Sequence, residues 1–158
     1  MGCDIHILTE FKNKDESSWS ALHFQAINPG RNYDLFNVLS GVRGHNDNPI
    51  ATSGWPKSVS YAAQNASGVR VNDENRAAAE GWVARGISKW LDFCTDMNGK
   101  PMYVSSPDWH SYGHCTIEQM SKALRKAGSS PEYRAMMAAA RSLEKDGMDV
   151  RFLFFYDN

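Results

Sequence analysis

Apolar and polar residues alternate along the start of the chain. Cys3 and Ile5 fall on one side of an extended segment, and Asp4 and His6 fall on the other. Side chains of a β-strand point alternately to its two faces, so this period of two predicts a strand with one apolar face. After a polar turn, residues 19–27 predict a second strand, and the two strands form an N-terminal hairpin.

The chain ends in VRFLFFYDN, a run of apolar residues about the length of one strand. It is apolar on both faces except at Arg151 and Asp157, so it predicts an inner strand that is buried on both sides. The segment KPMYVSS, residues 100–106, predicts a further strand.

Four segments between these ends repeat their apolar residues with helical spacing. The first is residues 32–42, capped by Asn32, and the second is residues 73–93, interrupted at Gly81 and Gly86. The third begins at the capping box of Thr116 and Gln119, and the fourth runs from Ser130 and Pro131 to near Gly147. Residues 41–60 have no period and predict a long loop, which in a compact domain is usually functional or mobile. The order of elements predicts a single α+β domain over residues 1–158. A small mixed or antiparallel sheet, including the hairpin and the C-terminal strand, would pack against about four helices.

Composition restricts the class of protein. The 158 residues are 42% hydrophobic and 22% charged, as in a globular domain, and the net charge of -1 argues against general nucleic-acid binding. No apolar run approaches the roughly 18 residues of a membrane span. The three cysteines are widely spaced, and no secretory leader precedes them, which predicts a reducing cytoplasm.

Two Asp-x-His pairs are the first candidates for chemistry. Asp4 and His6 point the same way, roughly 6.6 Å apart along a strand, and Asp108 and His110 are expected on a loop at a strand end. If the two pairs meet, their mixed nitrogen and oxygen ligands suit Zn, Mn or Fe. Each pair also has a structural interpretation, in which Asp4 orients His6 and Asp108 forms a turn.

A second candidate surrounds the helix predicted at residues 32–42. Arg31 and Asp34 lie at its start and Arg43 follows its end. Backbone N–H groups at a helix N-terminus and an arginine fork can together bind a phosphate or carboxylate. The alternatives are charges that complement the helix dipole, or ion pairs within the fold.

Several segments together resemble a family of small uncharacterised proteins of bacteriophages and bacterial genomes. The matching segments are MGCDIH, RNYDLFNVLSGVRG, GWPKSVS, DWHSY and VRFLFFYDN, which span nearly the whole chain. The resemblance supplies no activity. It implies that the family's pattern includes Asp4, His6, Arg31, Asn32, Tyr33, Asp34, Arg43, Asp108, His110 and Ser111. Departures occur at Lys57 in the middle loop and at residues 113–115 after Ser111, which puts a role for the middle loop in doubt.

The resulting hypothesis is a small metal-assisted hydrolase of the bacterial host's cytoplasm, acting on a phosphate-containing small molecule or nucleotide. Asp4, His6, Asp108 and His110 would hold the metal, which lowers the pKa of a bound water, and Arg31 and Arg43 would hold phosphoryl oxygens. Without a metal, His110 paired with Asp108 would act as general base. Asp34 is a further candidate catalytic residue. The alternative is a phage-encoded protein that sequesters a nucleotide or blocks a host protein without turnover. A third interpretation is a virion or accessory structural protein, in which the polar segments hold the fold together through buried ion pairs.

Overall fold

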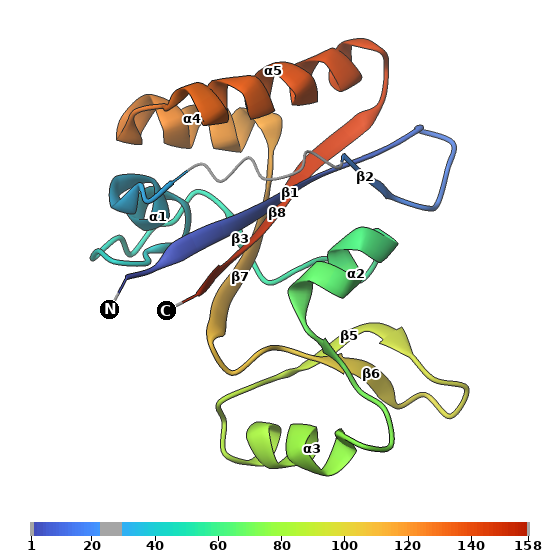
Figure 1. Cartoon of the computed structure of the whole chain (residues 1–158). Coiled ribbons are helices and arrows are strands. Elements are labelled where there is room, and N and C mark those ends of the chain that lie inside the picture. The colour runs from blue at the N-terminus through green and yellow to red at the C-terminus, as the bar shows by residue number, and fades with distance from the viewer. Residues whose placement is uncertain (1, 23–29, 158) are drawn as a thin grey trace.

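The computed structural model describes residues 2–22 and 30–157. Its centre is an antiparallel pair formed by the two ends of the chain, β1 (Asp4–Lys12) and β8 (Asp149–Asp157). Three further strands complete a five-stranded sheet in the order β2-β1-β8-β7-β3, namely β2 (Ser20–Leu22), β7 (Trp109–Thr116) and β3 (Thr52–Ser53). All neighbours are antiparallel, and the two termini lie side by side (Figure 1).

Three helices cover one face of this sheet: α1 (Tyr33–Ser40), α4 (Ile117–Ala127) and α5 (Pro131–Lys145) (Figure 1). Phe152, Phe154 and Tyr156 point from β8 into this main core and are completely buried. Alternate residues of β8 point to the other face, where Leu153 is also completely buried. The prediction that the C-terminal strand is buried on both sides is therefore confirmed.

The opposite face carries α2 (Tyr61–Ser67), which places Ala63 against Leu153. Beyond it lies a second sheet in the order β4-β6-β5, formed by β4 (Val69–Arg70), β6 (Pro101–Val104) and β5 (Trp90–Thr95). Helix α3 (Arg76–Ala84) packs against these strands (Figure 1). The predicted α+β class is confirmed, whereas the single-domain organisation stays a prediction. No helix in the described ranges is long and apolar enough to cross a membrane.

The helix starts that the sequence predicts are confirmed at atomic level. The side chain of Asn32 accepts a hydrogen bond from the Leu35 amide at 2.9 Å and caps α1. Thr116 and Gln119 form the reciprocal capping box of α4, and Ser130 caps α5 with Pro131 in the first turn. These short-range signals satisfy backbone N–H groups that a helix N-terminus otherwise leaves unpaired.

The helix predicted over residues 73–93 is wrong in its second half. Helix α3 ends at Ala84, and residues 90–95 form β5 instead. Gly86 has a left-handed φ of 72°, and the Ile87 amide donates to the Trp82 carbonyl at 3.1 Å. This is the closure of a Schellman motif, which ends a helix wherever glycine can adopt that conformation.

The loop predicted around His110 is also wrong, because His110 lies within strand β7. The β7–β8 register shifts between His110 and Gly113, and Ser111 has a φ of 51°. A bulge adds one residue to a strand, so it breaks the period of two by which a strand is recognised in sequence.

The predicted loop 41–60 contains the short β3, which pairs with β7, and helix α2 follows it. In the second predicted strand only β2 is described, and residues 23–27 lie outside the described residues.

Candidate functional site

The two Asp-x-His segments lie at the same end of the large sheet, on either side of β8. Asp157 is the register partner of Asp4 on one side and of Trp109 on the other. His6 is paired with Phe155 and His110 with Tyr156, which are consecutive residues of β8. Paired residues share a face and consecutive residues alternate, so His6 and His110 lie on opposite faces of the sheet.

Asp4 forms an ion pair with Arg31, not with a residue of the second segment. The Arg31 Nε lies 2.7 Å from one carboxylate oxygen, and its Nη2 lies 3.2 Å from the other. The hydrogen bond to Arg31 lowers the pKa of Asp4, and the same bond raises the pKa of Arg31. Gly2 permits the approach, since a Cβ at that position would lie 2.4 Å from the Arg31 Cζ.

His6 joins this pair through Asp157. Its Nε2 lies 2.9 Å from one Asp157 oxygen, and the other oxygen accepts the Asp4 amide at 2.9 Å. The imidazole stacks on Phe155 with ring centroids 4.7 Å apart. Within residues 2–22 and 30–157, no group of three or more His, Cys, Asp or Glu side chains is arranged to hold a metal ion. The divalent metal therefore stays a prediction, which elemental analysis of the purified protein would test.

His110 has a different set of neighbours. Its Nδ1 lies 2.9 Å from the Ser111 Oγ, and its Nε2 is buried without a hydrogen-bond partner in the described part of the chain. Its ring lies 6.0 Å from that of Tyr156. Asp108 is exposed and does not orient the imidazole, and Asp34 is exposed in the first turn of α1. The geometry thus brings together neither His110 and Asp108 nor His110 and Asp34.

His110 and Arg43 do come together, at an open cleft between the end of α1 and the start of β7. The cleft has a volume of about 390 Å³ and is lined by Val42, Arg43, Ile87, Pro107, Trp109 and His110. Arg43 is exposed, has a left-handed φ of 60°, and lies with its guanidinium carbon 6.0 Å from the centre of the Tyr33 ring. The Arg43 and His110 that the sequence predicted from separate segments therefore share one cleft, whereas Arg31 does not line it.

Ser111, the neighbour of His110 in the chain, lines a second, smaller pocket. That pocket measures about 190 Å³ and is lined in part by Ser40, Pro49, Thr52 and Ser111. A non-glycine residue with a positive φ is uncommon and costs of order 1 kcal/mol of backbone strain. The strain at Ser111 belongs to the bulge that turns His110 and Ser111 toward the two pockets.

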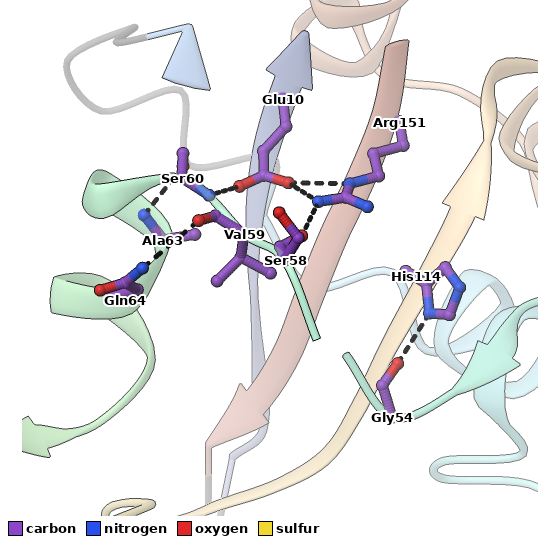
Figure 2. Close-up of polar contacts among 9 residues, drawn as sticks. All are labelled: Glu10, Gly54, Ser58, Val59, Ser60, Ala63, Gln64, His114 and Arg151. Carbon is purple, nitrogen blue, oxygen red and sulfur yellow. Dashed lines mark hydrogen bonds and ion pairs between the residues drawn. The ribbon is translucent and has the colours of Figure 1, made fainter. Parts of the chain in front are cut away.

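An ion pair that the sequence did not predict holds the other end of the sheet together. Glu10 is completely buried, and its carboxylate accepts the Arg151 Nε at 2.8 Å and the Ser60 amide at 2.6 Å (Figure 2). Arg151 also donates to the Ser58 carbonyl, and its guanidinium lies 3.7 Å from the centre of the Trp19 ring. Together Glu10 and Arg151 fasten the segment before α2 to the sheet.

The sequence contains partial signals for some of the residues that were not predicted to be important. Arg151 is the one cation inside an apolar strand, and a buried cation requires an anionic partner. Trp109 adjoins the predicted site residue His110, but its contribution to the cleft depends on strand β7. Nothing in the sequence indicates the left-handed conformation of Ser111 or the approach of Ile87 to the cleft.

A scan against protein-family models and searches of curated proteins and of solved structures found no significant match to this chain.

Proposed function

We propose that this protein binds a phosphate-containing small molecule, of the nucleotide class, in the cleft between α1 and β7. The observation that carries the proposal is the shared position of Arg43 and His110, which lie in segments far apart in the chain and line one cleft. The exposed Arg43 guanidinium offers a fork of N–H donors to a phosphate group, and the His110 ring lines the cleft beside it.

The remaining walls of the cleft suit the rest of such a ligand. Val42, Ile87 and Pro107 provide apolar contacts, and Trp109 provides an aromatic ring. Small-molecule sites commonly measure 300–1,000 Å³ and combine apolar walls with a few polar groups, and the cleft, at about 390 Å³, falls in this range. A base or sugar against the apolar wall and a phosphate at Arg43 would satisfy both kinds of surface.

A thermal-shift screen across the nucleotide class tests this function and ranks the ligands. The probes are ATP, GTP, CTP and UTP, the corresponding monophosphates, pyrophosphate and inorganic phosphate. A ligand that binds only the folded state raises the unfolding temperature in proportion to the logarithm of its excess over Kd. We expect at least one nucleotide to raise it more than inorganic phosphate does, and no stabilisation by any probe would contradict the proposal.

Hydrolysis of a phosphate ester is the second candidate, favoured by the hydrogen bond between His110, which lines the cleft, and Ser111, which lines the smaller pocket. A hydroxyl beside an imidazole is the arrangement of an activated nucleophile and its base. His110 would take the Ser111 proton as Oγ attacks phosphorus; the P–O bond to the rest of the ligand would break, and the leaving oxygen would take that proton. Water would then attack the phosphorus and give a proton through His110 to Ser111 Oγ as the Oγ–P bond breaks, which releases inorganic phosphate. Binding ranks first because no carboxylate among the described residues orients His110. Phosphate release in molar excess over the protein, abolished by Ser111→Ala, would establish hydrolysis.

A further inference from the structure

Helices α4 and α5 and the residues that join them form a groove. Its volume is about 440 Å³, and its lining includes Leu124, Met137 and three exposed arginines, Arg125, Arg134 and Arg141. It shares no lining residue with the cleft of Arg43 and His110. The groove therefore concerns a different ligand and does not depend on the proposed function.

The three arginines are held by neutral acceptors. Arg125 on α4 and Arg141 on α5 both donate to the hydroxyl of Ser121, at 3.1 and 2.9 Å. Arg134 donates to the Ser129 carbonyl at 3.0 Å. None of the three forms an ion pair with a described residue. Arg134 acts only weakly on Glu132, whose pKa is lowered chiefly by the Ser130 hydroxyl.

The segment that forms the groove is basic, although the whole protein is slightly acidic. Residues 117–145 contain six Lys and Arg and three Glu, whereas the whole chain has 17 basic and 18 acidic residues. Two guanidinium groups that share one hydroxyl repel each other, and an anion placed between them converts this repulsion into attraction. The groove therefore favours an anionic ligand, because no acidic side chain of the described residues forms an ion pair with its arginines.

We infer that the groove docks an acidic segment of a partner protein, in which carboxylates accompany an apolar side chain. Arginine forks bind carboxylates in a bidentate manner, and Leu124 and Met137 offer an apolar floor for the neighbouring side chain. A nucleic acid fits less well. No aromatic ring is among the described residues that line the groove, so the arginines are not accompanied by a surface on which bases could stack.

Fluorescence anisotropy on the full chain tests this inference with two labelled peptides. One is a Glu-rich amphipathic peptide with Leu at helical spacing, and the other has Gln at every Glu position. We expect saturable binding of the Glu peptide and about tenfold weaker binding of the Gln peptide. The variant R125Q/R141Q should weaken binding of the Glu peptide about tenfold, because two ion pairs are lost.

The control K122Q/K126Q removes the same amount of charge, here from α4 alone, at exposed positions that do not line the groove. It should change the affinity by less than about twofold. An equal loss of affinity in the two double variants would show that only net charge matters and would overturn the inference. The absence of binding between the Glu peptide and the wild-type protein at about 1 mM would also overturn it. Equal binding of a single-stranded oligonucleotide, or self-association that R125Q/R141Q abolishes, would assign the groove to another occupant. Circular dichroism checks folding, and Arg134→Gln replaces the double variant if that variant unfolds.

Discussion

Glu10 and Arg151 face each other directly across β1 and β8, and their ion pair is buried. The exposed fractions of the two side chains are 0% and 14%. Because Glu10 also accepts the Ser60 amide and Arg151 donates to the Ser58 carbonyl, one cross-strand pair joins both ends of the chain to the middle segment. The interpretation of polar residues as a support for the fold therefore applies here, at a pair that the sequence analysis did not predict.

Removal of one member of this pair should be costly. Glu10→Gln leaves the Arg151 guanidinium without its carboxylate, and breaking a buried pair typically costs about 3–5 kcal/mol. Urea denaturation monitored by circular dichroism should show this loss, whereas Asp15→Asn in the exposed turn should change stability by less than about 0.5 kcal/mol. A loss below about 1 kcal/mol for Glu10→Gln would contradict the described burial.

Two glycines should respond to alanine with opposite signs. A Cβ at Gly113 would lie 2.6 Å from the Phe154 ring and 3.2 Å from the Thr52 carbonyl. Neither neighbour can move easily, so Gly113→Ala should destabilise by about 1–3 kcal/mol. At Gly81, inside α3, the nearest atom is the tip of Arg85 at 3.4 Å, so Gly81→Ala should stabilise by up to about 1 kcal/mol. The same denaturation experiment measures both, and equal signs would refute the packing described around β7.

The strain at Ser111 can be separated from its hydrogen bond. Ser111→Ala and Ser111→Gly both remove the contact with His110, but only glycine adopts the φ of 51° without a steric penalty. Ser111→Gly should therefore be more stable than Ser111→Ala by about 1 kcal/mol. If alanine is equally stable, the left-handed bulge at this position is contradicted.

The ion pair of Asp4 and Arg31 predicts a pH response. Arg31 lowers the pKa of Asp4 below its ordinary value of 3.8. A carboxyl whose pKa is lowered in the folded state stabilises that state above its ordinary pKa, and this contribution is lost as the pH falls through the lowered value. Carboxyl titration by NMR should show that the pKa of Asp4 is higher in Arg31→Gln than in the wild type. An unchanged pKa would contradict the ion pair between Asp4 and Arg31.

Local signals in the sequence were sufficient for much of the fold. The alternation around Ile5 and the caps at Asn32 and Thr116 depend on residues close in the chain, and the structure confirms them. Strand β7 escapes recognition because the bulge at Ser111 interrupts its alternation. The segment from Trp90 was misassigned because a short apolar run fits a helix and a strand equally well.

The candidate site was less predictable because it depends on long-range register. Asp4 pairs with Arg31, which is 27 residues away in the chain. The face of the sheet that His110 occupies is decided by its pairing with Tyr156 in β8. A shift of one residue would place the imidazole on the other face, beside His6. Charge and residue type therefore indicated Arg43 and His110 as candidates, and only the strand register decided that these two line one cleft.

Calorimetric titration with the nucleotide that stabilises the protein most tests the central claim, ligand binding between α1 and β7. Wild type, Arg43→Gln, Trp109→Ala and the control Lys14→Gln, which lies in the exposed turn after β1, are compared. We predict stoichiometric binding by the wild type and the control. A loss of at least about tenfold in affinity is expected for Arg43→Gln, since hydrogen bonds between charged groups are worth about 1.5–3 kcal/mol. Undiminished binding by both Arg43→Gln and Trp109→Ala would place the ligand elsewhere and contradict the proposed function.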